Sequence, residues 1–294
     1  MASYSIKDLE ELSGIKAHTI RIWEKRYGIV VPARTDTNIR LYSDNDLKKL
    51  LNISILNRYG LKISHLARMD EEELKDKVIH ISRESTDTGL QIENLIISML
   101  ELDEWKFDKI LNDTIIKLGF EDTLVRLMHP FFEKIGLLWQ TGSINPAQEH
   151  FVSNLLRQKL IVAIDGQAPV QRDNPVNFIL FLHESEFHEL GLLFYSYLLK
   201  KNGIKVIYLG QAVPFDDLEK ITKIQKAEYF LTSFTTGITE GNLVKYLQNL
   251  SSSFPNHRIL YTGLQTAKIN GSLPQNLVKI ESVTHFRQYI GSIR

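Results

Sequence analysis

The chain has 294 residues, with 35 acidic residues, 35 Lys and Arg residues and a formal net charge of zero. It contains no cysteine, which excludes disulfides, thiolate metal sites and cysteine nucleophiles. The first residues lack the apolar core of a signal peptide and no run of 18 apolar residues occurs, so we expect a cytoplasmic protein without membrane contact. At roughly 150 residues per domain, the length predicts about two domains.

Two short helices are predicted at the start of the chain, at residues 5–13 and 17–27. Ser5 is a suitable N-cap, and Gly14 and Gly28 are suitable residues to end the two helices. Two helices joined by such a tight turn are typical of a helix-turn-helix. The alternating segment 30–42, with its turn at residues 35–38, predicts a β-hairpin that would form a wing.

Positive charge is concentrated in the same segment. Between Lys16 and Tyr42, six Lys and Arg residues stand against Glu24 and Asp36 only. Such a patch supplies the electrostatic footprint that a phosphate backbone needs, and a solvated basic face is the alternative interpretation.

The periodicity changes between the middle and the end of the chain. From Ser43 to about residue 167 the pattern is helical, with breaks near Asp87, Asp103, Gly119 and Gly142, which predicts a helical bundle. The polar, proline-containing residues 166–175 predict a linker. Alternating strands and helices follow and predict a doubly wound parallel sheet. Its strands are expected at residues 176–182, 205–209, 229–234, 259–261 and 277–280.

The N-terminal sequence, above all residues 18–28, 32–35 and 40–43, resembles the MerR family of DNA-binding regulators. The resemblance covers about residues 4–70 and implies an antiparallel dimer on a palindromic site, with the second helix of each winged helix in the major groove. Trp23 and Tyr27 are expected to pack in the core instead of stacking on bases. By this resemblance the residues that contact DNA are His18, Thr19 and Arg21 in the helix and Arg34, Arg40 and Tyr42 in the wing.

A second motif, E-x-H-x-x-G, runs from Glu186 through His188 to Gly191 and follows the first predicted strand of the sheet. Ligands of open α/β sheets bind at the carboxyl ends of the strands. A neutral imidazole there can ligate a metal ion through one nitrogen if an acceptor orients the other, and Glu186 is a candidate acceptor. An isolated loop histidine more often serves the surface or a helix cap, so the spacing after a strand carries the prediction.

This motif resembles the cobalamin-binding fold shared by methionine synthase and corrinoid mutases. The resemblance implies that His188 is the lower axial ligand of cobalt and that Ser233 lies beside the nucleotide tail of the cofactor. The Gly-Gly pair of that family is half present, as Gly263 and Leu264, and Leu264 would crowd the slot for the tail.

Upstream, Trp139, Glu149 and His150 form a W-x9-E-H pattern. Asn145 and Pro146 predict the start of the helix that carries Glu149 and His150, and a helical hairpin would bring Trp139 over them. The indole offers a flat apolar face, and the Glu-His pair offers hydrogen-bonding groups. A core tryptophan beside a surface Glu-His pair is the alternative interpretation.

Together with the domain order, this pattern resembles the CarH/LitR group of light-responsive, adenosylcobalamin-dependent MerR regulators. The resemblance implies a repressor gated by adenosylcobalamin and light, acting as a homodimer or homotetramer. It divides the chain into a winged helix-turn-helix (1–75), a helical bundle capping the cofactor (76–167) and a cobalamin-binding Rossmann-like domain (168–294). In that group a histidine can follow the capping tryptophan and ligate cobalt after illumination, whereas this chain has Gln140, whose amide is a poor cobalt ligand.

Two other functions remain open. In one, the protein is a MerR-type regulator whose cobalamin-like domain no longer binds cobalamin and serves protein contacts or another ligand. In the other, it is a corrinoid enzyme or methyl carrier. No Ser-His-Asp signature, Gly-rich phosphate loop or companion catalytic barrel is visible in the sequence, so we expect a regulator and not an enzyme.

Overall fold

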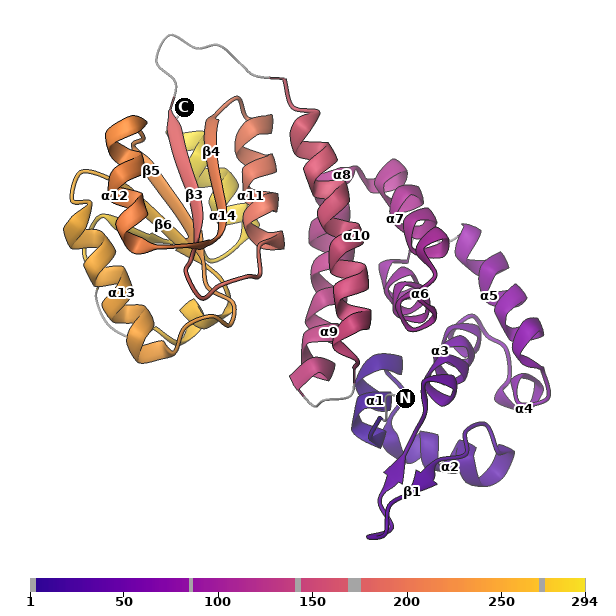
Figure 1. Ribbon diagram of the computed structural model, residues 1–294. Coiled ribbons are helices and arrows are strands. Elements are labelled where there is room, and N and C mark those ends of the chain that lie inside the picture. The colour runs from indigo at the N-terminus through magenta and orange to yellow at the C-terminus, as the bar shows by residue number, and fades with distance from the viewer. Residues whose placement is uncertain (1–3, 85–86, 141–143, 169–175, 270–272, 294) are drawn as a thin grey trace. The chain divides into compact units, whose positions relative to one another are not determined.

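The computed structural model describes residues 4–84, 87–140, 144–168, 176–269 and 273–293, without the side chains of 82–84, 137–140, 240 and 268. The chain divides into two compact units, residues 1–155 and 156–294 (Figure 1). The expected division at residues 75 and 167 stays a prediction. Among the described residues, no helix combines the length and apolar character needed to cross a membrane.

The first unit begins with the predicted helix-turn-helix, α1 (Ile6–Ser13) and α2 (Ala17–Tyr27). Ser5 and Asp8 form a capping box at the start of α1, and Gly14 ends it in the left-handed conformation at φ 70°. The hairpin follows as the antiparallel pair β1 (Ala33–Arg34) and β2 (Arg40–Leu41). Both the helices and the wing therefore form where the sequence predicts them.

Helix α3 (Asp44–Arg58) starts at a second capping box, formed by Ser43 and Asp46. Its side chains are buried almost all round, and it contacts α1 as well as α5 and α6 of the following helical segment. The short α4 (Ile63–Leu66) leads from α3 into that segment.

The helical segment has breaks at three of the expected residues, whereas the break expected near Gly142 lies outside the described residues. Asp87 and Asp103 are the N-caps of α6 and α7, and Gly119 ends α7. Its core includes Phe107 and Phe131, whose rings meet edge to face with centroids 6.1 Å apart. The elements are α5 (Glu71–Glu84), α6 (Thr88–Glu101), α7 (Glu104–Leu118), α8 (Phe120–Thr123), the π-helical turn η1 (Leu124–Met128), α9 (His129–Gln140) and α10 (Pro146–Asp165).

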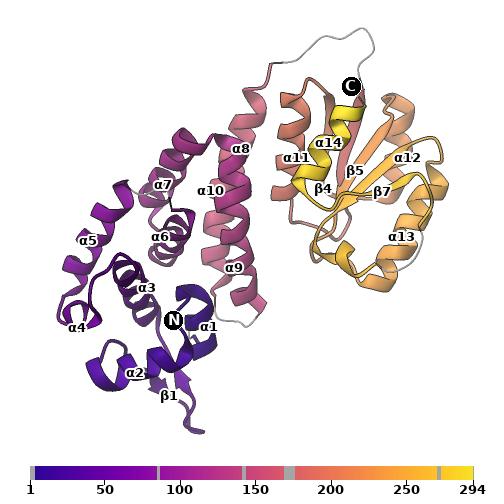
Figure 2. The same cartoon turned by 180° about the vertical axis from the view of Figure 1, so that it is seen from behind.

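The second unit contains the predicted parallel sheet, with strand order β4-β3-β5-β6-β7. Figures 1 and 2 show α11 and α14 on one face of the sheet and α12 and α13 on the other. The strands are β3 (Asn177–His183), β4 (Lys205–Val213), β5 (Tyr229–Ser233), β6 (Arg258–Thr262) and β7 (Leu277–Lys279). The helices are α11 (Leu190–Lys201), α12 (Phe215–Ile224), α13 (Glu240–Ser253), the 3₁₀ turn η2 (Leu264–Lys268) and α14 (Val283–Ser292).

Alternate residues of β3 pack against opposite layers of helices, which makes the strand apolar on both faces. Ile179 and Phe181 belong to a buried cluster with Leu218 of α12 and Leu250 of α13. The connection after β3 leads to β4 on one side of it, and the connection after β4 leads to β5 on the other side. Sheets of this kind bind ligands at the point where the strand order switches, which here is the crevice at the carboxyl ends of β3 and β5. The fold therefore places the loop containing Glu186 and His188 at that crevice.

Candidate functional site

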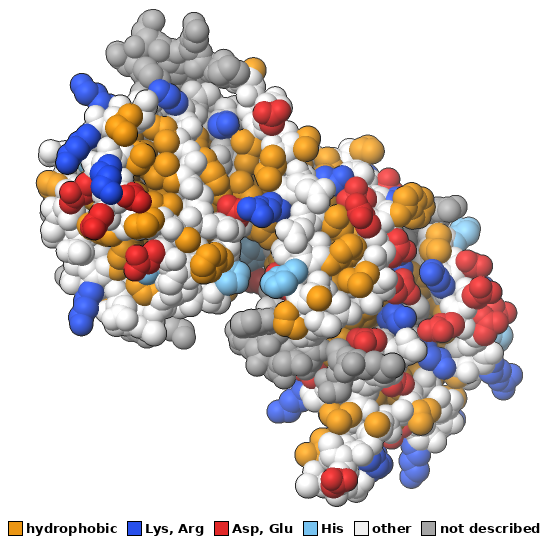
Figure 3. All heavy atoms as spheres, viewed as in Figure 1, with side chains coloured by type: hydrophobic (Ala, Val, Ile, Leu, Met, Phe, Trp, Pro, Cys, Tyr) orange, Lys and Arg blue, Asp and Glu red, His pale blue; other side chains and the backbone are white. Residues whose placement is uncertain are grey.

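Helix α2 separates a buried face from an exposed one. Ile20 is fully buried and Trp23 nearly so, whereas His18 and Arg21 are exposed and Thr19 is half-buried. In Figure 3 several Lys and Arg side chains lie at the end of this unit that carries α2 and the hairpin. The exposed face of α2 is thus polar and positively charged, as a helix that enters the major groove requires.

The hairpin is tied to α2 by an ion pair. Nε of Arg40 donates to both carboxylate oxygens of Glu24, at 3.2 and 3.1 Å. Arg34 at the outer end of the hairpin is exposed and donates to Oδ1 of Asn38 at 2.5 Å. Of the two wing arginines, Arg34 is therefore open to a phosphate, and Arg40 would have to share its charge with Glu24.

Tyr42 does not have the surface position that we expected. Its side chain is only 1% exposed, its backbone pairs with that of Tyr4, and its hydroxyl group donates to Glu24 at 3.4 Å. A ring that packs between the first residues and α2 supports the wing from inside, and the expected contact of Tyr42 with a phosphate stays a prediction.

At the crevice of the sheet, the buried carboxylate of Glu186 joins two loops. Its Oε2 accepts the backbone N–H groups of Thr235, Thr236 and Gly237, at 2.7, 2.9 and 3.1 Å. Its Oε1 accepts the backbone N–H groups of Phe187 and His188, at 3.1 and 3.0 Å, and lies 2.6 Å from Nδ1 of His188. Glu186 therefore organises the loop after β3 and the loop after β5 at once.

These hydrogen bonds keep Glu186 ionised. Burial opposes its ionisation, but the bonds from the His188 ring and from the backbone N–H groups of Thr236 and Gly237 lower the pKa of Glu186 to about 2. A carboxylate that stays charged in a site only 1% exposed is a strong acceptor for an imidazole N–H.

The imidazole of His188 is presented at the surface of the unit, with its side chain 56% exposed. Nδ1 faces Glu186 and also lies 3.1 Å from the hydroxyl oxygen of Thr236. A carboxylate at Nδ1 fixes the tautomer and the ring orientation and raises the basicity of Nε2. This arrangement is what a metal-ligating histidine requires.

Gly237 allows the two loops to approach each other. A Cβ atom there would lie 2.5 Å from the carbonyl oxygen of Ser185 and 2.8 Å from Cα of Glu186. The sequence reasoning missed residues 235–237. The available signal was a Thr-Thr-Gly segment directly after the third predicted strand, which neighbours the first strand in a sheet of this order.

The other residues expected in the sheet unit surround the same crevice. Gly191 lies in the first turn of α11, and a Cβ atom there would meet no atom within 4 Å. Ser233 ends β5, is 6% exposed and pairs in register with Thr262. Gly263 follows β6 at φ 105°, where a Cβ atom would lie 2.6 Å from the backbone nitrogen of Phe234.

Leu264 is 72% exposed and starts the 3₁₀ turn η2. Its exposed side chain follows Gly263 at the end of β6, and the expected crowding of the nucleotide tail by Leu264 stays a prediction.

The remaining candidates lie on the helical segment. Trp139 and Gln140 belong to α9, but their side chains lie outside the described residues. Glu149 and His150 are in the first turns of α10, with Oε2 of Glu149 2.9 Å from Nδ1 of His150. The side chain of His150 is 70% exposed and that of Glu149 26% exposed, so both present hydrogen-bonding groups at the surface.

Comparison with known families identifies two domains. Residues 4–73 match the model described as "MerR HTH family regulatory protein", and residues 91–163 match the model described as "B12 binding domain". The chain therefore combines a MerR-type helix-turn-helix with a B12-binding domain, a combination that supports a DNA-binding regulator controlled by cobalamin.

The relatives are transcriptional regulators. The chain is 26% identical over 281 residues to the HTH-type transcriptional repressor CarH of Myxococcus xanthus, covering 94% of this chain and 93% of CarH. It is 26% identical over 212 residues to the repressor CarA of the same organism, covering 71% of this chain and 68% of CarA. The regulator MlrA of Escherichia coli matches at 33% identity over 76 residues, covering 26% of this chain and 31% of MlrA.

Among solved structures, the monomethylamine corrinoid protein of Methanosarcina barkeri has a similar fold. The TM-score is 0.51 at 13% sequence identity, over 67% of this chain and 95% of that protein. At this identity the likeness supports the fold, a helical segment followed by a parallel sheet, and nothing finer.

Proposed function

We propose that the protein is a transcriptional repressor whose binding to DNA is controlled by adenosylcobalamin. The observation that carries the proposal is the presence, in one chain, of a MerR-type helix-turn-helix and a B12-binding domain, aligned over nearly the full length of the repressor CarH. It would act in the cytoplasm as a homodimer or homotetramer on a palindromic operator.

The residues of the sheet unit fit a cobalamin. His188 is exposed and oriented at Nδ1 by the ionised Glu186, which suits coordination of cobalt through Nε2. The open space at Gly191 leaves room for a bulky planar group at the start of α11. Cobalamin would supply a cobalt ion that accepts an axial imidazole, together with a visible chromophore.

Further contacts are proposed for the cofactor's other parts. Ser233 and Gly263, at the ends of β5 and β6, would border the nucleotide tail. Trp139, Glu149 and His150 would meet the adenosyl group, the indole by stacking and the Glu-His pair by hydrogen bonds to ribose hydroxyls.

Control of DNA binding requires the cofactor to bind one assembly state of the protein more tightly than another. We propose that bound adenosylcobalamin would favour the DNA-bound oligomer and that illumination would remove this preference. Gln140 follows the capping tryptophan, and an amide is a poor cobalt ligand. We therefore expect that residue 140 would not hold the cobalt of a bound cobalamin after illumination.

The test is to add adenosylcobalamin to the protein in the dark, desalt it, and record its absorbance, oligomer size and retention of an operator fragment before and after green light. Retained colour and cofactor-dependent DNA retention are expected. His188→Ala should abolish the spectral change of axial coordination and weaken binding at least tenfold. Colourless protein that still binds DNA would instead support the regulator that has lost its cofactor.

A further inference from the structure

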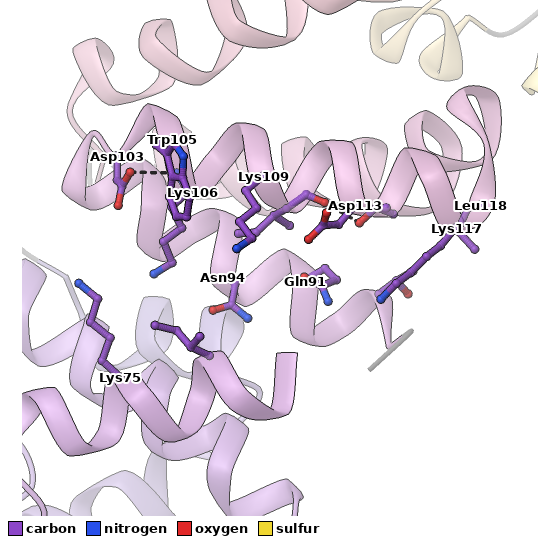
Figure 4. A pocket seen from close by; sticks show the side chains of 14 residues that line it. Lys75, Gln91, Asn94, Asp103, Trp105, Lys106, Lys109, Asp113, Lys117 and Leu118 are labelled. Carbon is purple, nitrogen blue, oxygen red and sulfur yellow. Dashed lines mark hydrogen bonds between the residues drawn. The ribbon is translucent and has the colours of Figure 1, made fainter. Parts of the chain in front are cut away.

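A second pocket lies within the first unit, away from the crevice of the sheet. It has a volume of about 400 Å³ and is enclosed by α5, α6 and α7 (Figure 4). This volume is within the range of sites that hold small organic molecules. None of the residues predicted to bind DNA or cobalamin lines it.

Positive charge predominates in the lining of this pocket. The charged residues are Lys75, Lys106, Lys109, Lys117, Asp103 and Asp113. The carboxylate of Asp103 is engaged as the N-cap of α7, where it accepts the backbone N–H of Lys106 at 2.9 Å. Figure 4 shows Lys75 of α5 and Lys106 of α7 extending from opposite sides into the same space.

The ammonium group of Lys106 is held there at an electrostatic cost. Burial lowers the pKa of Lys106; Glu101 counteracts this, and the positive charge of Lys75 lowers the pKa further. A solvated charged face would leave these groups apart in water. Nζ of Lys106 lies 3.8 Å from Oε2 of Glu101, which compensates part of this charge. The four lysines of the lining still exceed its two aspartates, and an anion between them would offset the excess.

The rest of the lining is apolar or neutral. Ile79, Ile110 and Leu118 contribute aliphatic surface, and Gln91 and Asn94 contribute amide groups that are 9% and 3% exposed. Trp105 also lines the pocket, with Nζ of Lys109 4.8 Å from the centroid of its ring. Such a site can take up the apolar body of a ligand while the lysines take up its charge.

We propose that this pocket binds a small organic anion with an apolar body, such as an aryl-alkyl carboxylate. Its position gives the ligand a regulatory consequence. The MerR match ends at residue 73, within α5, and the B12-binding match begins at residue 91, within α6. The lining residues of α5, Lys75 and Ile79, directly follow the MerR match, and those of α7 belong to the B12-binding match, so a ligand would fix α5 against the B12-binding domain.

The test uses isothermal titration calorimetry on the full-length protein with three probes: 4-phenylbutyrate, the neutral 4-phenyl-1-butanol, and inorganic phosphate. We expect 4-phenylbutyrate to bind one to one and to change the tryptophan fluorescence. The alcohol and inorganic phosphate should each bind at least about tenfold more weakly, because each lacks one of the two parts that the pocket recognises.

Lys109→Gln and Lys75→Gln, both at exposed positions, should each weaken binding of 4-phenylbutyrate about tenfold, and Lys223→Gln on α12 should leave it unchanged. Circular dichroism checks that the variants fold. Absence of saturable binding, equal binding of the alcohol or of phosphate, or equal weakening by Lys223→Gln would overturn the proposal. The variants should keep the cobalamin spectrum of the unmodified protein, so failure here is separable from failure of cobalamin control.

Discussion

Replacing Glu93 by glutamine should stabilise the protein at pH 8, although the change removes an ion pair. Glu93 lies on α6 with its side chain 3% exposed, and it accepts Nη2 of Arg58, at the end of α3, at 2.7 Å. Burial raises the pKa of Glu93 to about 7, against the lowering effects of Arg58 and Lys134. The desolvation cost of this carboxylate therefore exceeds the attraction of its partners.

The size of the effect follows from this shift. The ordinary value is 4.5, so the folded state holds the proton more tightly than the unfolded state by about 2.5 pH units, or on the order of 3 kcal/mol. Because the folded pKa is raised, this contribution to stability is complete below pH 4.5 and is lost as pH rises to about 7. Glutamine resembles the protonated, neutral form of Glu93, so the Glu93→Gln variant should not lose this stability as pH rises.

The assay is urea unfolding followed by circular dichroism at pH 8 and pH 5. Glu93→Gln should raise the free energy of unfolding by roughly 1–3 kcal/mol at pH 8 and by less than about 1 kcal/mol at pH 5. The exposed Glu72→Gln on α5 serves as the matched control and should change little at either pH. If Glu93→Gln destabilises the protein at pH 8, the ion pair is net favourable and this reasoning is wrong.

Three further predictions concern the cofactor crevice and the DNA interface. Gly237→Ala should weaken cobalamin binding about tenfold in an absorbance titration, because its Cβ atom would collide with backbone, whereas Gly241→Ala, with nothing within 4 Å, should not. Glu186→Gln should weaken cobalamin binding by roughly 10–100-fold. Because the pKa of Glu186 in the folded protein is about 2, its carboxylate should stay ionised and keep this contribution to cobalamin binding until pH falls to about 2. In gel-shift assays Arg21→Ala should weaken DNA binding and reduce the salt slope by about one, while Tyr42→Phe, a change inside the core, should leave both near the original values.

Local patterns were sufficient to predict most elements of the fold. The capping residues Ser5 and Ser43 and the glycines at 14 and 28 define helix ends through backbone geometry that a few neighbouring residues determine. The five strands were predicted because a buried parallel strand needs a continuous apolar run. Strand β4 extends to Val213, beyond the predicted residue 209, through an irregular end with Gly210 and Ala212 at positive φ.

Features that depend on distant pairing were not predictable in the same way. Tyr42 carries the alternation of a wing residue, but its pairing with Tyr4 and its contact with Glu24 of α2 lie in a buried position. Glu186 was predicted as a partner of His188. Its hydrogen bonds to residues 235–237 form because β3 and β5 are adjacent in the sheet, which the sequence does not show directly. Leu264 is expected to crowd the nucleotide tail because it replaces the second glycine of a Gly-Gly pair, and this expectation can be tested only with the cofactor bound.

Helix α3 has a consequence for how this protein can be cut or recombined. It is matched as part of the MerR domain, yet α6 of the B12-binding domain packs on it and Arg58 at its end reaches Glu93. A fragment ending at residue 75 would contain α3 without α6 and most of α5. The buried leucines and isoleucines of α3 would then form an exposed apolar patch that promotes aggregation. Grafting this DNA-binding region onto another sensor therefore requires a donor helix that reproduces the inner face of α6.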